Sequence, residues 1–144
     1  MIENTNSPNW LEKFGSLYHQ ADAVIDEVTG AINSEYEPAT RIALEKAVAV
    51  ITPLLNQLKA TTKPDDKSHK EVNKRFIDGY KVFLDSCNYG VEYLNKPSPW
   101  NRSVWWITLE KATDKLRDAV ACYNACLPAT DSELEEEPSA EIQD

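Results

Sequence analysis

The sequence predicts an all-α protein, a single-domain four-helix bundle with up-down-up-down topology and a disordered acidic C-terminal tail. The chain of 144 residues is 42 % hydrophobic and 27 % charged, which is typical of an ordinary globular domain. It contains only four glycines among many alanine, leucine, lysine and glutamate residues, which favours helices over strands joined by tight turns. Four long segments repeat apolar residues in steps of three and four, the period of an amphipathic helix.

One domain is expected, followed by the tail. The tail holds seven acidic residues, no basic residue and few apolar ones, so it cannot bury enough surface to fold alone. Removing these seven from the 24 acidic residues leaves 17 against 15 basic ones, so the rest of the chain is nearly neutral. The expected limits are a flexible arm at 1–6, a bundle at 7–128 with helices at about 8–32, 38–60, 68–95 and 99–127, and the tail at 129–144.

Prolines and capping residues mark the expected helix ends. Ser7 and Ser98 each precede a proline, which is the order expected for an N-cap followed by the first helical position. Ser68 and Glu71 have the spacing of a capping box at the start of the third helix. Pro53 lies inside the second helix, where it removes one backbone hydrogen bond. Because the apolar period continues past it, we expect a kink rather than a break.

Two glycines of the third helix, Gly79 and Gly90, require a packing reason, because glycine costs a helix about 1 kcal/mol relative to alanine. We expect them to make room for a bulky side chain such as Trp105 on the fourth helix. The fourth helix carries an apolar seam that should face the core, formed by Trp105, Leu109, Ala112, Leu116, Ala119, Tyr123 and Cys126.

The histidines do not form a metal or catalytic pattern. Carboxylate-bridged metal bundles need a Glu-x-x-His pair on each of two helices, and this chain has none. His19 falls on the expected outer face of the first helix and His69 at the cap of the third, so neither is placed to activate a nucleophile. There is also no glycine-rich phosphate loop. We expect no metal, no cofactor and no catalytic residue, which argues against an enzyme.

Three cysteines allow two interpretations. Cys122 and Cys126 are four residues apart on one helix face, and Cys87 falls on the buried stripe of the third helix. The first interpretation is that they pack as small hydrophobic residues. The alternative is a functional interior, in which a small apolar ligand or a thiol-linked cofactor or metal binds near Cys87, Cys122 and Tyr123.

Charge and hydropathy predict where the protein acts and which classes of partner it does not bind. No apolar run approaches the roughly 18 residues of a membrane span, and no secretory signal pattern opens the chain. An odd number of cysteines then suggests reduced thiols in the cytoplasm. The overall negative charge opposes general nucleic-acid binding, although a basic stretch runs from Lys63 to Arg75.

The start of the fourth helix carries the candidate binding surface. Trp100, Val104 and Ile107 fall on the face opposite the core seam, and Trp106 lies on its flank. Exposed aromatic side chains are typical of binding surfaces, so we expect an adaptor that binds a protein partner or itself here. The other interpretation is that a loop, the N-terminal arm or the tail covers these side chains. The acidic tail would be a second contact, engaging a basic partner or folding back onto the basic stretch.

Overall fold

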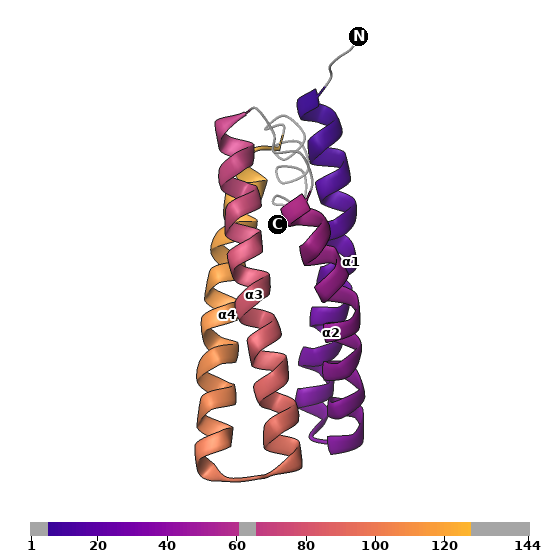
Figure 1. The fold of residues 1–144 in the computed structure, drawn as a ribbon, viewed down its shortest axis with the longest axis vertical. Coiled ribbons are helices and arrows are strands. Elements are labelled where there is room, and N and C mark those ends of the chain that lie inside the picture. Colours follow the sequence, from indigo (N-terminus) through magenta and orange to yellow (C-terminus); the bar gives the residue numbers. More distant parts are fainter. Residues whose placement is uncertain (1–5, 61–65, 128–144) are drawn as a thin grey trace, which may run out of the picture.

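The computed structural model describes residues 6–60 and 66–127, which form four helices and, within that part of the chain, no strand. The helices alternate in direction along the long axis (Figure 1). The all-α, up-down-up-down four-helix class is therefore confirmed. Residues 1–5 and 128–144, where the arm and the tail were expected, lie outside the described residues. The helices are α1 (Asn6–Ser34), α2 (Glu37–Ala60), α3 (Lys67–Asn95) and α4 (Pro99–Ala125).

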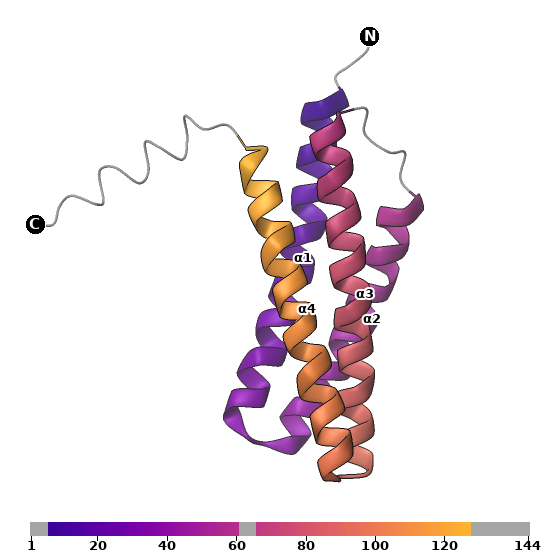
Figure 2. The same cartoon turned by 90° about the vertical axis from the view of Figure 1, so that its left-hand side faces the viewer.

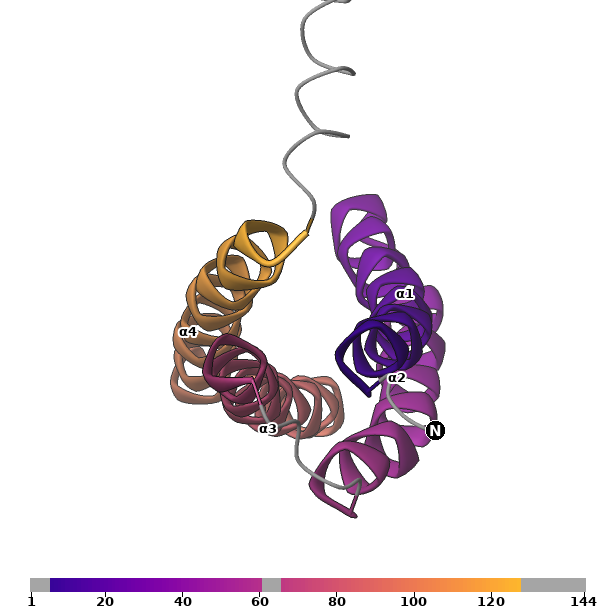
Figure 3. The ribbon, with the colours of Figure 1, turned by 90° about the horizontal axis from the view of Figure 1, so that it is seen from above.

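The four helices pack as a chain of neighbours rather than as a closed ring. The most extensive contact joins α3 to α4, and the next two join α1 to α2 and α2 to α3. Viewed from above, the ribbons form an arc with α1 and α4 at its two ends (Figure 3). The side chain of Tyr123 bridges these ends, because its ring lies 5.3 Å from that of Phe14 and 5.4 Å from that of Tyr18.

The apolar stripe of α3 lies at the centre of the core, where it meets α1, α2 and α4. Phe76 is fully buried, and its ring packs edge-on against Phe14 at 4.8 Å and Tyr18 at 5.4 Å. Burial of aromatic and aliphatic surface of this extent is the main favourable term in folding. The buried core residues of α3 are Val72, Phe76, Tyr80, Phe83 and Cys87.

The two glycines of α3 fix how closely α4 approaches it. A Cβ atom at Gly79 would lie 2.6 Å from Leu116 Cδ2, and one at Gly90 would lie 2.8 Å from the Trp105 ring. Both distances are shorter than a real carbon–carbon contact, so any larger residue would force a shift. The expectation that these glycines make room for a bulky neighbour is confirmed, with Trp105 at Gly90 and Leu116 at Gly79.

The start of α4 follows the expected capping pattern, but the start of α3 does not. Ser98 Oγ accepts a hydrogen bond from the Asn101 N–H at 3.1 Å, and Pro99 takes the first helical position. At α3 the cap is Asp66, whose carboxylate accepts from the N–H groups of Ser68 at 2.7 Å and His69 at 3.2 Å. The capping box at Ser68 was therefore wrong. A carboxylate is a good N-cap acceptor and its charge is favourable at the positive end of the helix dipole, so α3 begins earlier.

Pro53 lies within α2, and the helix runs unbroken from Glu37 to Ala60. Pro53 is exposed to solvent. Because proline has no N–H group, the carbonyl of Ala49, four residues earlier and also exposed, has no intrahelical hydrogen-bond donor. That carbonyl can bond to water instead. The continuous helix agrees with the unbroken apolar period, and the kink at this proline stays a prediction.

The turn between α1 and α2 supports a stability prediction. Glu35 follows α1 with φ 61°, a left-handed conformation that costs a residue with a Cβ atom about 1–2 kcal/mol. Glu35→Gly removes that strain, which stabilises the protein, but it also raises the entropy of the unfolded chain, which opposes folding. We therefore expect the free energy of unfolding, measured with urea, to rise by a net amount of about 0.5–1 kcal/mol. Glu37→Gly, two residues later at the first position of α2, is the control and should destabilise, because it removes the acidic side chain at the positive end of the helix dipole. A loss of stability in Glu35→Gly would contradict this account of the turn.

Candidate functional site

The first turns of α4 present large apolar side chains to solvent. Trp100 is 75 % exposed, Ile107 65 % and Trp106 39 %, while Val104 is half-buried. These four side chains, called the α4 patch below, are the ones that the sequence singled out. Trp100 and Ile107 point away from the core because they lie roughly opposite Trp105 around the helix, and the half-buried Val104 lies at the side of the helix between the two faces.

Trp105 fixes the position of the patch on the bundle. Its ring is buried over Gly90, where no side chain competes for the space, and lies 5.7 Å from the ring of Tyr93. Trp106 stacks on Trp105 with ring centroids 5.2 Å apart and planes inclined by 20°. The exposed Trp106 ring therefore rests on a buried one, which limits the conformational entropy that it would lose on binding a partner.

A surface groove of about 690 Å³ adjoins the patch where α3 passes into α4. Two residues of the patch, Trp106 and Ile107, line it, and two prolines hold its backbone. Arg102 supplies the charge in this lining, and it forms no ion pair within residues 6–60 and 66–127. The groove is lined by Tyr93, Pro97, Ser98, Pro99, Arg102, Ser103, Trp106 and Ile107.

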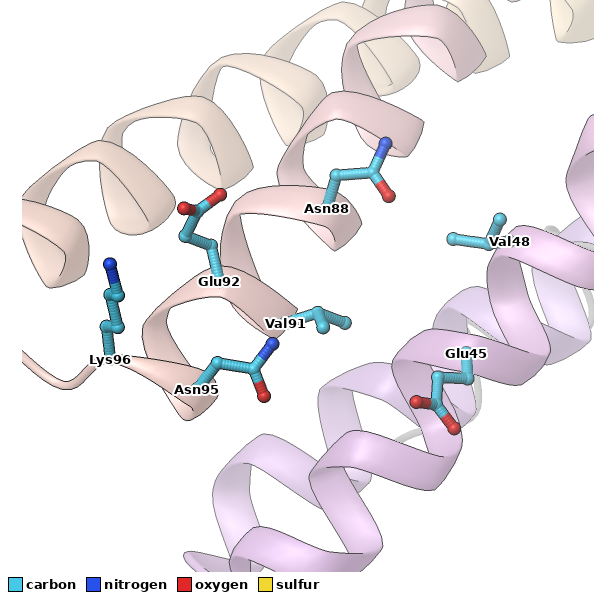
Figure 4. A pocket seen from close by; sticks show the side chains of 7 residues that line it. All are labelled: Glu45, Val48, Asn88, Val91, Glu92, Asn95 and Lys96. Atoms are coloured by element: carbon cyan, nitrogen blue, oxygen red, sulfur yellow. The ribbon is translucent and has the colours of Figure 1, made fainter.

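A second groove, of about 590 Å³, lies between α2 and α3 (Figure 4). Its apolar lining consists of Val48 on α2 and Val91 on α3. The remaining lining side chains are charged or amide groups that are exposed to solvent, so none of them needs a ligand to satisfy it. This groove therefore lacks the convergent buried polar groups of a small-molecule site. The polar lining is Glu45, Asn88, Glu92, Asn95 and Lys96.

The alternative site, at the cysteines, is not assembled as one pocket. Gly79 faces Leu116 and Gly90 faces Trp105, and this antiparallel register places Cys87 opposite a point on α4 about 14 residues before Cys122. At 1.5 Å per residue the two thiols lie about 20 Å apart along the bundle. Cys87 is fully buried, whereas Cys122 is half-buried. Cys87 and Cys122 therefore cannot bind the same small ligand, cofactor or metal ion.

His69 is buried, contrary to the expectation of a surface histidine. Its ring stacks on Trp10 at 5.2 Å, and its Nδ1 atom has no hydrogen-bond partner in the described structure. The expectation was wrong because the buried stripe of α3 continues for about two turns on the N-terminal side of Phe76, and His69 lies seven residues before that residue. His19 is exposed, as expected.

The described residues contain no group of three or more histidine, cysteine, aspartate or glutamate side chains arranged to hold a metal ion. In the same part of the chain, no helix is both long and apolar enough to cross a membrane. No family model matches the chain, and the searches of curated proteins and of solved structures find no significant match. The assignment of a site therefore depends on the geometry alone.

The three thiols should differ in reactivity. Burial raises the pKa of Cys87 to about 12, and the Ser86 hydroxyl offsets this only in part. Because the thiolate is the nucleophile, Cys87 should resist iodoacetamide in the folded protein at about pH 8, while Cys122 and Cys126 are alkylated. Mass spectrometry of peptides at timed intervals measures the order. Alkylation of Cys87 at the rate of the other two would contradict its burial, and the unfolded chain in urea is the control for equal intrinsic reactivity.

Proposed function

We propose that this chain is a non-enzymatic interaction module that binds another protein through the α4 patch. The observation that supports this is the exposure of Trp100 and Ile107 on the first turns of α4, next to Trp106 and beside a groove of about 690 Å³. Large exposed apolar side chains gain most when a partner removes them from water, and tryptophan is the residue most enriched among binding hot spots. Three free thiols fit a reducing compartment, so the proposed place of action is the cytoplasm.

The proposed partner element is an amphipathic helix that carries an acidic residue. Trp100, Val104 and Ile107 have the i, i+4, i+7 spacing of side chains on one stretch of helix surface, against which a second helix can pack. The carboxylate of the partner would meet Arg102, the charged side chain in the groove beside the patch. A basic or uncharged helix would leave that guanidinium without an ionic partner, so charge contributes to the choice of partner.

A paired set of variants tests the patch. The double variant Trp100→Ala, Ile107→Ala removes its two most exposed side chains, and we expect it to lose the cellular partner that the wild-type protein captures. The control is Tyr36→Ala, Ile42→Ala, which removes side chains of similar exposure, 63 % and 66 %, from the α1–α2 hairpin. Quantitative mass spectrometry of proteins captured by the three baits reads the result.

Specific loss in the patch variant alone supports the proposal. Thermal unfolding should be almost unchanged in both variants, because substitutions of exposed residues usually alter stability by less than about 0.5 kcal/mol. Equal capture by all three baits, or equal loss in both variants, would show that the α4 patch is not the specific binding site.

A further inference from the structure

The first two turns of α3 carry an exposed basic face. Lys67, Lys70 and Lys74 follow one another in steps of three and four, so their side chains project from one side of the helix. All three are exposed, and none forms an ion pair within the described residues. Of the acidic side chains nearby, Glu71 is already paired, because Arg75 Nε lies 2.8 Å from its carboxylate, while Asp78 and Asp118 line the same surface hollow as Lys74. This surface, called the lysine face below, also lies at the positive end of the α3 dipole.

The end of α4 lies at the same end of the bundle as the lysine face. The antiparallel register that pairs Gly79 with Leu116 brings the last turn of α4 level with the first turn of α3. Figures 1 and 2 show the end of α4 and the start of α3 at the same end of the bundle. Cys126 supports this proximity, since burial, Cys122 and the Asp66 cap of α3 together raise the pKa of its thiol. The centre of the lysine face is turned away from α4, because Lys70 lies nine residues before Gly79 and therefore on the opposite side of α3 from Leu116. The chain that leaves α4 must pass around α3 to reach it.

The chain that follows α4 matches this face in charge and in reach. Residues 131–144 contain seven carboxylate side chains and no basic one. Fully extended, these fourteen residues can span about 46 Å. The lysine face runs only about 10 Å along α3, from Lys67 to Lys74. The chain after residue 127 must cross the separation of two packed helices, about 8–10 Å, and then the width of α3, about 10 Å, and both together are within its reach.

We propose that the acidic segment 131–144 docks on the lysine face of its own chain. The negative charge of this segment complements the lysine face, and α4 ends at the same end of the bundle. Tethering raises the effective concentration of the segment to about the millimolar range, so even weak ion pairs favour the contact within one chain over the contact between chains. Docking would shield the lysines from other polyanions. This inference is independent of the α4 patch, which lies at the opposite end of α3.

Zero-length cross-linking with a carbodiimide tests the contact in the full-length protein. The reagent joins a carboxylate to a lysine amine when the two are in contact, with loss of water to the reagent. An equal mixture of ¹⁴N and ¹⁵N protein separates links within a chain from links between chains. At about 25 mM salt we expect links from 131–144 to Lys67, Lys70 and Lys74 within one chain, and about fivefold fewer at about 0.5 M salt, where charges are screened.

A second variant measures the shielding of the lysines directly. It keeps the full chain but changes the seven carboxylates of 131–144 to amides, which leaves every described residue intact. Acetylation of Lys67, Lys70 and Lys74 should then become about threefold faster at low salt, while Lys96 and Lys111 serve as unchanged references. Links spread evenly over all exposed lysines, links mainly between chains, or unchanged acetylation of the lysine face would each overturn the inference.

Discussion

Phe76→Ala should lower the free energy of unfolding by about 3–5 kcal/mol, the usual range for removing a buried phenylalanine. The ring of Phe76 is fully buried where α3 meets α1 and α4, and it lies 6.4 Å from the ring of Tyr123. Since Tyr123 bridges α1 and α4, the cavity left by the substitution would loosen the contacts of Tyr123 with Phe14 and Tyr18 that join these two helices. The loss should therefore be near the upper end of the range.

Urea unfolding followed by far-ultraviolet circular dichroism measures this effect. Tyr89→Ala is the matched control, because Tyr89 is an aromatic residue of the same helix whose side chain is exposed. We expect its effect to stay within about 0.5 kcal/mol. Similar unfolding midpoints for the two variants would contradict the placement of Phe76 at the centre of the core.

Gly90→Ala should destabilise the protein by about 1–3 kcal/mol, although alanine is the better helix former. The added methyl group would approach the Trp105 ring to 2.8 Å and Leu44 Cδ1 to 2.8 Å. The Leu44 side chain can rotate away from the added methyl group. The Trp105 ring is rigid and also packs against the rings of Tyr93 and Trp106. The ring must shift, and because Trp106 stacks on it, the α4 patch should shift as well.

Gly30→Ala provides a control of the opposite sign. Gly30 lies in α1, and a Cβ atom there would have no neighbour within 4 Å. The same substitution should therefore stabilise α1 by about 0.5–1 kcal/mol through helix propensity alone. Thermal unfolding of both variants under one condition reads the difference. If both substitutions shifted the midpoint in the same direction, the close contact at Gly90 would be refuted.

The helices were predictable because their signals are local and repeated. Helix caps, such as Ser98 followed by a proline, and the three-and-four spacing of apolar residues can be recognised within one or two turns of the chain. The scarcity of glycine supports the same assignment. The packing role of Gly90 could also be predicted, because a glycine within a helix lowers its stability unless close packing against a neighbour compensates. The outward direction of Trp100 and Ile107 followed from helix geometry in the same way.

The start of α3 was harder to predict because two residue types compete there. Asp66 and Ser68 can both cap a helix, and only the hydrogen bonds of the folded chain show that the carboxylate takes the N–H groups. The burial of His69 depends on Trp10 of another helix, which no local pattern reveals. The separation of Cys87 from Cys122 likewise follows from the register of α3 and α4, a property of the packed pair.

The most direct test of the proposed binding surface is the affinity of the purified partner for three proteins. These are the wild type, the Trp100→Ala, Ile107→Ala variant and the Tyr36→Ala, Ile42→Ala control, measured by calorimetry at one salt concentration. Loss of two hot-spot side chains should raise the Kd by about 30-fold or more in the patch variant and leave the control within about twofold of wild type. An unchanged Kd in the patch variant would show that the partner binds elsewhere on the bundle.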